Sequence, residues 1–235
     1  MRLTLLFNLC NLRNLLRNLF CAQVEIQQLR IIAGKYHGRT LKSPPSLQVR
    51  PTSDRLRETL FNVIAPRIED SRFLDLCAGS GAVGIEALSR GARHSTFVDR
   101  SRKMCGLVET NLDLCQIPEE QTHVVQAEAA EFLRQTLHRT TPKFSNRKSG
   151  PSQHSEHSDT WDIAFFDPPY ATDYVQVLAL FGAETYSLLS ETGLLIVEHH
   201  HKKELADAVG SIIRSRILKQ GDSTLSFYEA KTHGC

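Results

Sequence analysis

The chain has 235 residues, of which 41% are hydrophobic and 23% are charged, and its net charge at pH 7 is +2. This length allows one large α/β domain with a complete core, and the composition is that of a globular protein. Six scattered cysteines without a C-x-x-C pair argue against a disulfide framework and a zinc site, and predict a reduced, cytoplasmic protein.

Residues 1–29 read as a leader. The first 24 residues contain no acid, three arginines and many leucines, several of which fall on one helical face. Asparagine and arginine interrupt the run too often for a membrane-spanning helix, and no membrane association is expected. Two interpretations stay open: an organelle-targeting peptide, which would change the predicted location, and an extension created by a mis-assigned start codon.

Charge separates the next segment from the rest of the chain. Residues 30–67 hold eight basic and two acidic residues, a net charge of +6, whereas residues 68–235 have a net charge of −6. A basic block followed by an acidic body is typical of a protein with one face toward a polyanion, although a solvated surface explains the charge equally well. We therefore predict a basic N-terminal extension over 30–67 and the main domain over 68–235.

Strand-like and helix-like segments alternate from Phe73 onward, which predicts a doubly wound, mostly parallel α/β sheet. Two segments around Gly221 predict a closing antiparallel hairpin. Residues 139–160 are polar and low in complexity, and predict a flexible insertion. The predicted strands are 73–78, 95–99, 123–127, 161–166, 193–198, 212–219 and 224–230, and the predicted helices are 82–90, 101–115, 129–138 and 173–189.

A glycine turn follows the first predicted strand. Glycines there let the backbone approach a ligand that any Cβ would exclude, but their G-x-G-x-x-G spacing alone is a weak signal. Asp75 inside the strand favours S-adenosylmethionine, since methyltransferases commonly keep an acid near its methionine moiety. Asp99 can accept both ribose hydroxyls, as it could in an NAD site. Glu128 would face the adenine amine or simply cap a helix. The predicted cofactor-binding residues are Asp75, Ala78, Gly79, Ser80, Gly81, Asp99 and Glu128.

The tetrapeptide Asp167-Pro168-Pro169-Tyr170 ends a buried strand, where ligands bind in open α/β sheets. The exocyclic amine of a base is a poor nucleophile because its lone pair is delocalised into the ring. Asp167 and the Pro168 carbonyl could accept its two N–H bonds, and the prolines fix that geometry without competing donors. Tyr170 could stack on the base. These four residues are the predicted catalytic residues.

With these motifs in place, the chain resembles the bacterial 16S ribosomal RNA guanine-N2 methyltransferases from about Arg30 to Glu229. The markers are Arg30–Arg39 (RIIAGKYHGR), Arg50–Asn62 (RPTSDRLRETLFN), Asp75–Gly81, Glu86–Gly91, Asp167–Tyr170 and Gly221–Tyr228. The first two are more specific than the glycine turn or DPPY. Cys77 stands where the family usually has an aromatic residue, and the leader has no counterpart.

The resemblance implies a Rossmann-like class I fold with a seven-stranded sheet and a small basic N-terminal β-hairpin that helps hold RNA. It implies methyl transfer from S-adenosylmethionine to the N2 amine of one guanine in 16S rRNA, as free RNA or in an assembling 30S subunit, by a protein that we expect to be monomeric. For Arg57, bracing the main domain is an equal alternative. The implied RNA contacts are Lys35, Arg39, Arg50, Arg55 and Arg57.

Two alternatives stay open. A DNA adenine-N6 methyltransferase also uses DPPY, but normally carries a larger target-recognition domain than residues 30–67. An NAD-dependent oxidoreductase is supported only by the glycine spacing. The run His199-His200-His201 is predicted to be a solvated strand end, so no metal site is expected.

Overall fold

The computed structural model describes residues 28–44, 54–140, 160–169 and 173–231. The predictions for Arg50, Tyr170, the leader up to residue 27 and the insertion from 141 to 159 therefore lie outside the described residues. Within the described ranges, no helix is long and apolar enough to cross a membrane.

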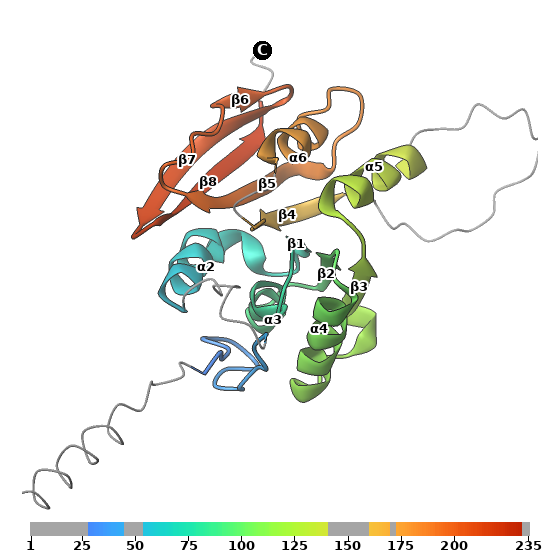
Figure 1. Cartoon of the computed structure of the whole chain (residues 1–235), viewed down its shortest axis with the longest axis vertical. Coiled ribbons are helices and arrows are strands. Elements are labelled where there is room, and N and C mark those ends of the chain that lie inside the picture. Colours follow the sequence, from blue (N-terminus) through green and yellow to red (C-terminus); the bar gives the residue numbers. More distant parts are fainter. Residues whose placement is uncertain (1–27, 45–53, 141–159, 170–172, 232–235) are drawn as a thin grey trace, which may run out of the picture.

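In the described part of the chain, eight strands form one sheet in the order β3-β2-β1-β4-β5-β8-β7-β6 (Figure 1). The predicted doubly wound, mostly parallel sheet with an antiparallel C-terminal hairpin is confirmed. The parallel strands are β1 (Arg72–Leu76), β2 (His94–Asp99), β3 (Thr122–Gln126), β4 (Trp161–Phe166) and β5 (Leu189–His200). The antiparallel strands are β6 (Ala208–Val209), β7 (Ile212–Gln220) and β8 (Ser223–Ala230).

Two details differ from the sequence predictions. The expected count was seven strands; the additional strand, β6, has two residues, too few for the alternation that marks a strand in a sequence. The predicted helix 173–189 ends at Phe181, where Gly182 packs so closely on the β6 backbone that a Cβ would lie 2.2 Å from the Val209 carbonyl oxygen. The residues after this helix lead into β5, which begins at Leu189 rather than Gly193.

Helices cover both faces of the sheet (Figure 1). One core cluster lies under α2 (Asp54–Ile68), α3 (Ala82–Ser89) and α4 (Arg102–Leu114), and a second lies under α5 (Ala129–Thr140) and α6 (Tyr174–Phe181). A 3-10 helix, η1 (Glu119–Gln121), precedes β3. Along β1, Phe73 belongs to the first cluster and Leu74 to the second, because successive side chains of a strand point to opposite faces.

Residues 28–44, which include the first part of the predicted N-terminal extension and are called the extension from here on, pack on α3 and α4. The two arms of the extension pair at one antiparallel bridge, Arg30 with Thr40, so the hairpin implied by the resemblance is limited to a single pair of residues. Leu29, Ile31, Tyr36 and Leu41 are buried in the same cluster as α2 and α3. The extension therefore shares a core with the sheet, and the domain boundary at 67–68 stays a prediction.

Candidate active site

The sheet order reverses between β1 and β4, and open α/β sheets bind ligands at the carboxyl edge of such a switch point. The glycine turn follows β1 and the segment Asp167–Pro169 follows β4, so both motifs lie on either side of this point. The Asp167 amide donates to the Leu76 carbonyl at 3.4 Å, which places the beginnings of the two motifs in contact.

Left-handed backbone conformations shape the glycine turn. The φ angles of Cys77, Gly79 and Gly81 are 66°, 56° and 76°, values that favour glycine at the latter two positions. Gly84 has a packing role instead, because a Cβ there would lie 2.3 Å from the Phe97 ring. The structure therefore divides the three motif glycines between turn geometry and helix–strand packing.

Two carboxylates accept backbone amides of this turn and of the helix that follows it. The buried Asp75 accepts the Gly84 amide at 2.9 Å. Asp99, at the end of β2, accepts the Gly79 amide at 3.0 Å and the Ser101 amide at 2.8 Å, one on each oxygen. A carboxylate has about four acceptor positions, so each oxygen of Asp99 retains acceptor capacity.

Carboxylates from four different strand ends converge on Cys77. Burial raises the pKa of the Cys77 thiol, and the charges of nearby carboxylates raise it further: those of Asp99, Asp167, Asp75 and Glu128. Burial also raises the pKa of Asp75 to about 7. The hydrogen bond from the Gly84 amide lowers this pKa, and the charge of Asp99 raises it. The site is thus electronegative and suits a cationic ligand.

The residues present fit S-adenosylmethionine. Its sulfonium and ammonium groups match the acidic surroundings, and a Cβ built on Gly79 would meet only the Cys77 oxygen at 3.9 Å, so the space beside the turn is open. Ala78 is half-buried, and Ser80 is buried within the turn. The exposed Glu128 accepts the Ala130 amide at 2.8 Å, so one of its oxygens caps α5.

The predicted catalytic segment lies at the same edge. Asp167 is half-buried, Pro168 is buried and Pro169 is exposed. Neither proline has an N–H group, so this turn presents carbonyl and carboxylate acceptors without competing donors. Tyr170, the predicted stacking residue, lies outside the described residues.

Three predicted RNA contacts are at least partly accessible. Lys35 and Arg55 are exposed, and Arg39 is half-buried. The Lys35 ammonium lies 5.2 Å from the centre of the Tyr36 ring, the Arg39 guanidinium lies 5.3 Å from it, and Arg39 also donates to the Cys115 carbonyl. The extension thus presents part of its basic charge at the surface.

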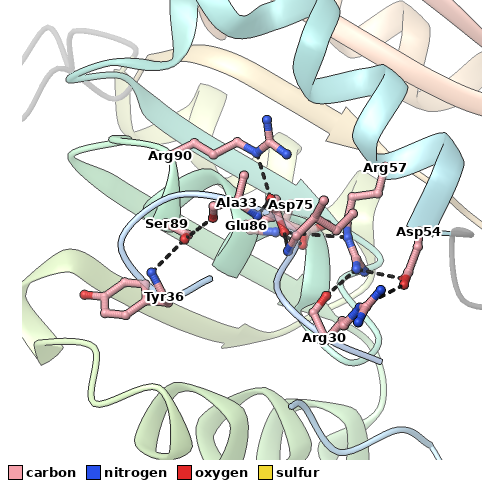
Figure 2. Close-up of polar contacts among 11 residues, drawn as sticks. Arg30, Ala33, Tyr36, Asp54, Arg57, Asp75, Glu86, Ser89 and Arg90 are labelled. Atoms are coloured by element: carbon pink, nitrogen blue, oxygen red, sulfur yellow. Dashed lines mark hydrogen bonds and ion pairs between the residues drawn. The ribbon is translucent and has the colours of Figure 1, made fainter. Parts of the chain in front are cut away.

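Arg57 is a correction to the predicted RNA contacts. Its side chain is fully buried, lies 3.0 Å from an Asp54 oxygen and 3.8 Å from a Glu86 oxygen, and donates to the Arg30 carbonyl at 2.5 Å (Figure 2). Burial lowers the pKa of Arg57, and the Glu86 and Asp54 carboxylates oppose this shift. A side chain without accessible surface cannot meet a phosphate, so the bracing alternative is correct.

Glu86 and Asn111 are among the buried polar residues that hold the extension, and neither was predicted. Glu86 on α3 accepts the amides of Ile32 and Ala33 at 2.8 and 3.0 Å. Asn111 on α4 bonds to Lys42. A glutamate inside the apolar helix sequence 82–89 signals a buried, paired charge, whereas an asparagine in a polar helix carries no such signal.

The histidine run is only partly solvated, contrary to the prediction: His199 is buried in β5, His200 is half-buried and His201 is exposed. His200, His201 and Asp222 form the one group of three or more in the described residues whose potential metal-ligating atoms all lie within 4.8 Å of one another. The His200 Nδ1 atom accepts the Lys202 amide at 3.1 Å, an arrangement that favours a proton on its other ring nitrogen. The expectation of no metal site stays a prediction.

Comparisons with known proteins agree with this architecture. The family model described as conserved hypothetical protein 95 matches residues 29–146 and 137–229. The ribosomal RNA small subunit methyltransferase D of Escherichia coli is 37% identical over 171 residues, which are 73% of this chain and 71% of that protein. The protein of the same name from Haemophilus influenzae is 34% identical over 179 residues, covering 76% and 82%.

A solved structure extends the match to three dimensions. The Escherichia coli protein yhhF superposes with a TM-score of 0.68 at 29% identity, covering 88% of this chain and 99% of its own. The resemblance drawn from the sequence motifs is thereby confirmed. The chain belongs to the family described as conserved hypothetical protein 95, together with these small-subunit methyltransferases D.

Proposed function

We propose that the protein transfers a methyl group from S-adenosylmethionine to the exocyclic N2 amine of a guanine in small-subunit ribosomal RNA. One observation carries the proposal: Asp167-Pro168-Pro169 and the acidic glycine turn lie together at the switch point of the sheet. The donor of the methyl group and the amine that receives it would then meet between β1 and β4.

The names of the relatives support the substrate class. Two bacterial proteins that are 34% and 37% identical to this chain are named ribosomal RNA small subunit methyltransferase D. The exposed Lys35 and Arg55 suit an RNA backbone, because basic side chains bind phosphates and position a nucleic acid without reading its sequence.

Residues around the glycine turn would bind and orient the methyl donor. Asp99 would accept the ribose hydroxyls, and the acidic surroundings of Asp75 would attract the cationic methionine end. Glu128 would accept the adenine amine with the oxygen that is not directed at the α5 amides. When bound, S-adenosylmethionine supplies the activated methyl group.

Residues after β4 would prepare the receiving amine. The Asp167 carboxylate and the Pro168 carbonyl would each accept one amine N–H, which turns the nitrogen lone pair toward the methyl group. The proton lost from nitrogen would pass to Asp167 and then to solvent. Because both acceptors are held by a buried strand end and a buried proline, most of the acceleration would come from orientation.

The test uses purified protein, labelled S-adenosylmethionine and small ribosomal subunits from a strain lacking the modification, with DNA in a parallel reaction. Digestion to nucleosides and mass analysis should identify N2-methylguanosine in the ribosomal reaction alone. Label in DNA adenine would overturn the proposal in favour of an adenine-N6 methyltransferase. In a third reaction that contains a nicotinamide cofactor, turnover of that cofactor in place of methyl transfer would point to an oxidoreductase.

A further inference from the structure

Asn111 joins the two parts of the molecule that the proposed reaction needs. Its side-chain amide donates to the Ser80 carbonyl in the glycine turn at 2.8 Å and to the Lys42 carbonyl in the extension at 3.1 Å. Its carbonyl oxygen accepts the Lys42 amide at 2.8 Å. One side chain therefore holds the turn and the extension at once.

Burial makes this junction sensitive to change. Asn111 is 0% exposed, and both amide hydrogens and the carbonyl oxygen are engaged. The helix that carries it also packs directly on the turn, since a Cβ on Gly81 would lie 3.2 Å from two Val108 carbons. A buried polar group cannot exchange its partners for water, so a shift of Ser80 would cost hydrogen bonds at Lys42.

A second set of hydrogen bonds attaches the extension to α3 and does not involve the glycine turn. Ser89 donates to the Ala33 carbonyl at 2.5 Å and accepts the Tyr36 amide at 2.9 Å, and Glu86 accepts two further amides (Figure 2). Both residues lie in α3 beyond its first turn, and neither is bonded to Ser80. Among the described hydrogen bonds that attach the extension, those at Asn111 continue to the turn, whereas those at Glu86 and Ser89 do not.

We infer that Asn111 is a positioning residue that couples cofactor binding to RNA binding. A ligand that orders the turn around Ser80 also orders Lys42 through Asn111, so the extension binds RNA with less entropy to lose. Coupling of this kind is reciprocal: RNA tightens cofactor binding by the same factor. The inference rests on the proposed function, since it takes the turn as the cofactor site and the extension as an RNA contact.

The test is a linkage measurement with S-adenosylhomocysteine, which allows no turnover, and an unmodified 16S rRNA transcript. In the wild type, each ligand should tighten the other by about tenfold, within the range usual for coupled sites. Asn111→Asp keeps the side-chain shape but sets a carboxylate against two carbonyls. It should reduce the coupling factor to below about twofold.

Ser89→Ala is the matched control. It loosens the extension at the attachment that does not reach the turn, so it should weaken RNA binding yet keep the wild-type coupling factor. Equal coupling in Asn111→Asp and the wild type would overturn the inference, as would a wild-type factor of one. If the wild type still produces N2-methylguanosine in that case, the proposed function stands and only the coupling fails.

Hydrogen exchange of the wild type provides a test that needs no variant and no RNA. The Lys42 amide donates to Asn111, so S-adenosylhomocysteine alone should slow exchange in the peptide spanning residues 39–44. Binding without this protection would overturn the inference even if Asn111→Asp failed to fold. Absence of any binding would overturn the proposed function as well.

Discussion

The two turns that meet at the candidate site are held in different ways. The glycine turn after β1 is held by side chains: Asp99 accepts its Gly79 amide and Asn111 donates to its Ser80 carbonyl. The segment after β4 is restricted by the rings of Pro168 and Pro169, which have no amide to donate.

This contrast separates two tasks at one edge of the sheet. A turn held through its own amides and carbonyls is restricted in shape and loses its remaining freedom when a ligand binds, which suits the binding of a cofactor. A turn restricted by proline rings holds its carbonyls without competing N–H donors, which suits an amine that must give up a proton. Variants on the two sides should therefore affect different measurements.

The largest effect on the reaction is expected in the proline-containing segment after β4. Asp167→Ala removes the acceptor for the amine, so kcat should fall by about 10³-fold or more, whereas the Kd for S-adenosylmethionine should change by less than about threefold. Single-turnover kinetics and calorimetry measure the two quantities. Asp173→Asn is the control, since it changes an acid six residues away and keeps a side chain able to cap α6. Equal losses of binding and rate would refute the assigned role.

On the glycine side, Asp99→Ala should act on binding. The change leaves the Gly79 and Ser101 amides without their acceptor and removes the proposed ribose contact. Hydrogen bonds to a charged group contribute about 1.5–3 kcal/mol, so the Kd for S-adenosylmethionine should rise by about 10- to 100-fold. Calorimetry of this variant beside Asp113→Ala, an exposed acid on α4, measures the difference. An unchanged Kd would remove Asp99 from the cofactor site.

The pH dependence of cofactor binding should report Asp75. Its pKa is raised to about 7 by burial, so the carboxyl is largely protonated at pH 6 and largely ionised at pH 8. A cationic ligand favours the ionised form, so affinity should rise with pH by about tenfold across this interval, with release of a proton. Asp75→Asn keeps an acceptor for the Gly84 amide and should show a flatter profile. If affinity depends on pH in the same way in the wild type and in Asp75→Asn, the pH dependence does not come from Asp75.

The smallest effect is expected at the basic surface. Reversing charge at Lys35 and Arg39 together should weaken RNA binding several-fold and reduce the salt dependence of log K by about 1.5, as for the loss of two phosphate contacts. Cofactor affinity measured without RNA should stay unchanged. Lys219→Glu, an exposed change on β7, is the control. A salt slope equal to that of the wild type would place the RNA elsewhere.

Most of the sheet could be predicted from sequence because its central strands are continuous apolar runs with turn residues between them. The strand 161–166 was predicted with its observed bounds, Trp161–Phe166. The predicted helix 173–189 was wrong in its second half because its end at Phe181 depends on contact between Gly182 and β6, which is distant in sequence. The strand β6 is too short to leave a pattern.

The candidate site was predictable to the extent that it depends on strand ends. Asp75, Asp99 and Asp167 each lie in or directly after a parallel strand, and the carboxyl ends of parallel strands meet at one edge. The burial of Arg57 was not predictable, because an arginine in a basic segment has the same local sequence whether it meets a phosphate or a buried glutamate. Only long-range packing distinguishes the two.

The sequence by itself determined the class of fold, the family and the motifs, since these depend on local periodicity and on short runs of residues. The tertiary structure decided which basic residues face solvent and which polar residues join the extension to the glycine turn. The Asn111 contact with Ser80 spans 31 positions and that with Lys42 spans 69. Such contacts arise only when the chain has packed, because hydrogen bonding in a buried site depends on neighbours that the sequence does not place side by side.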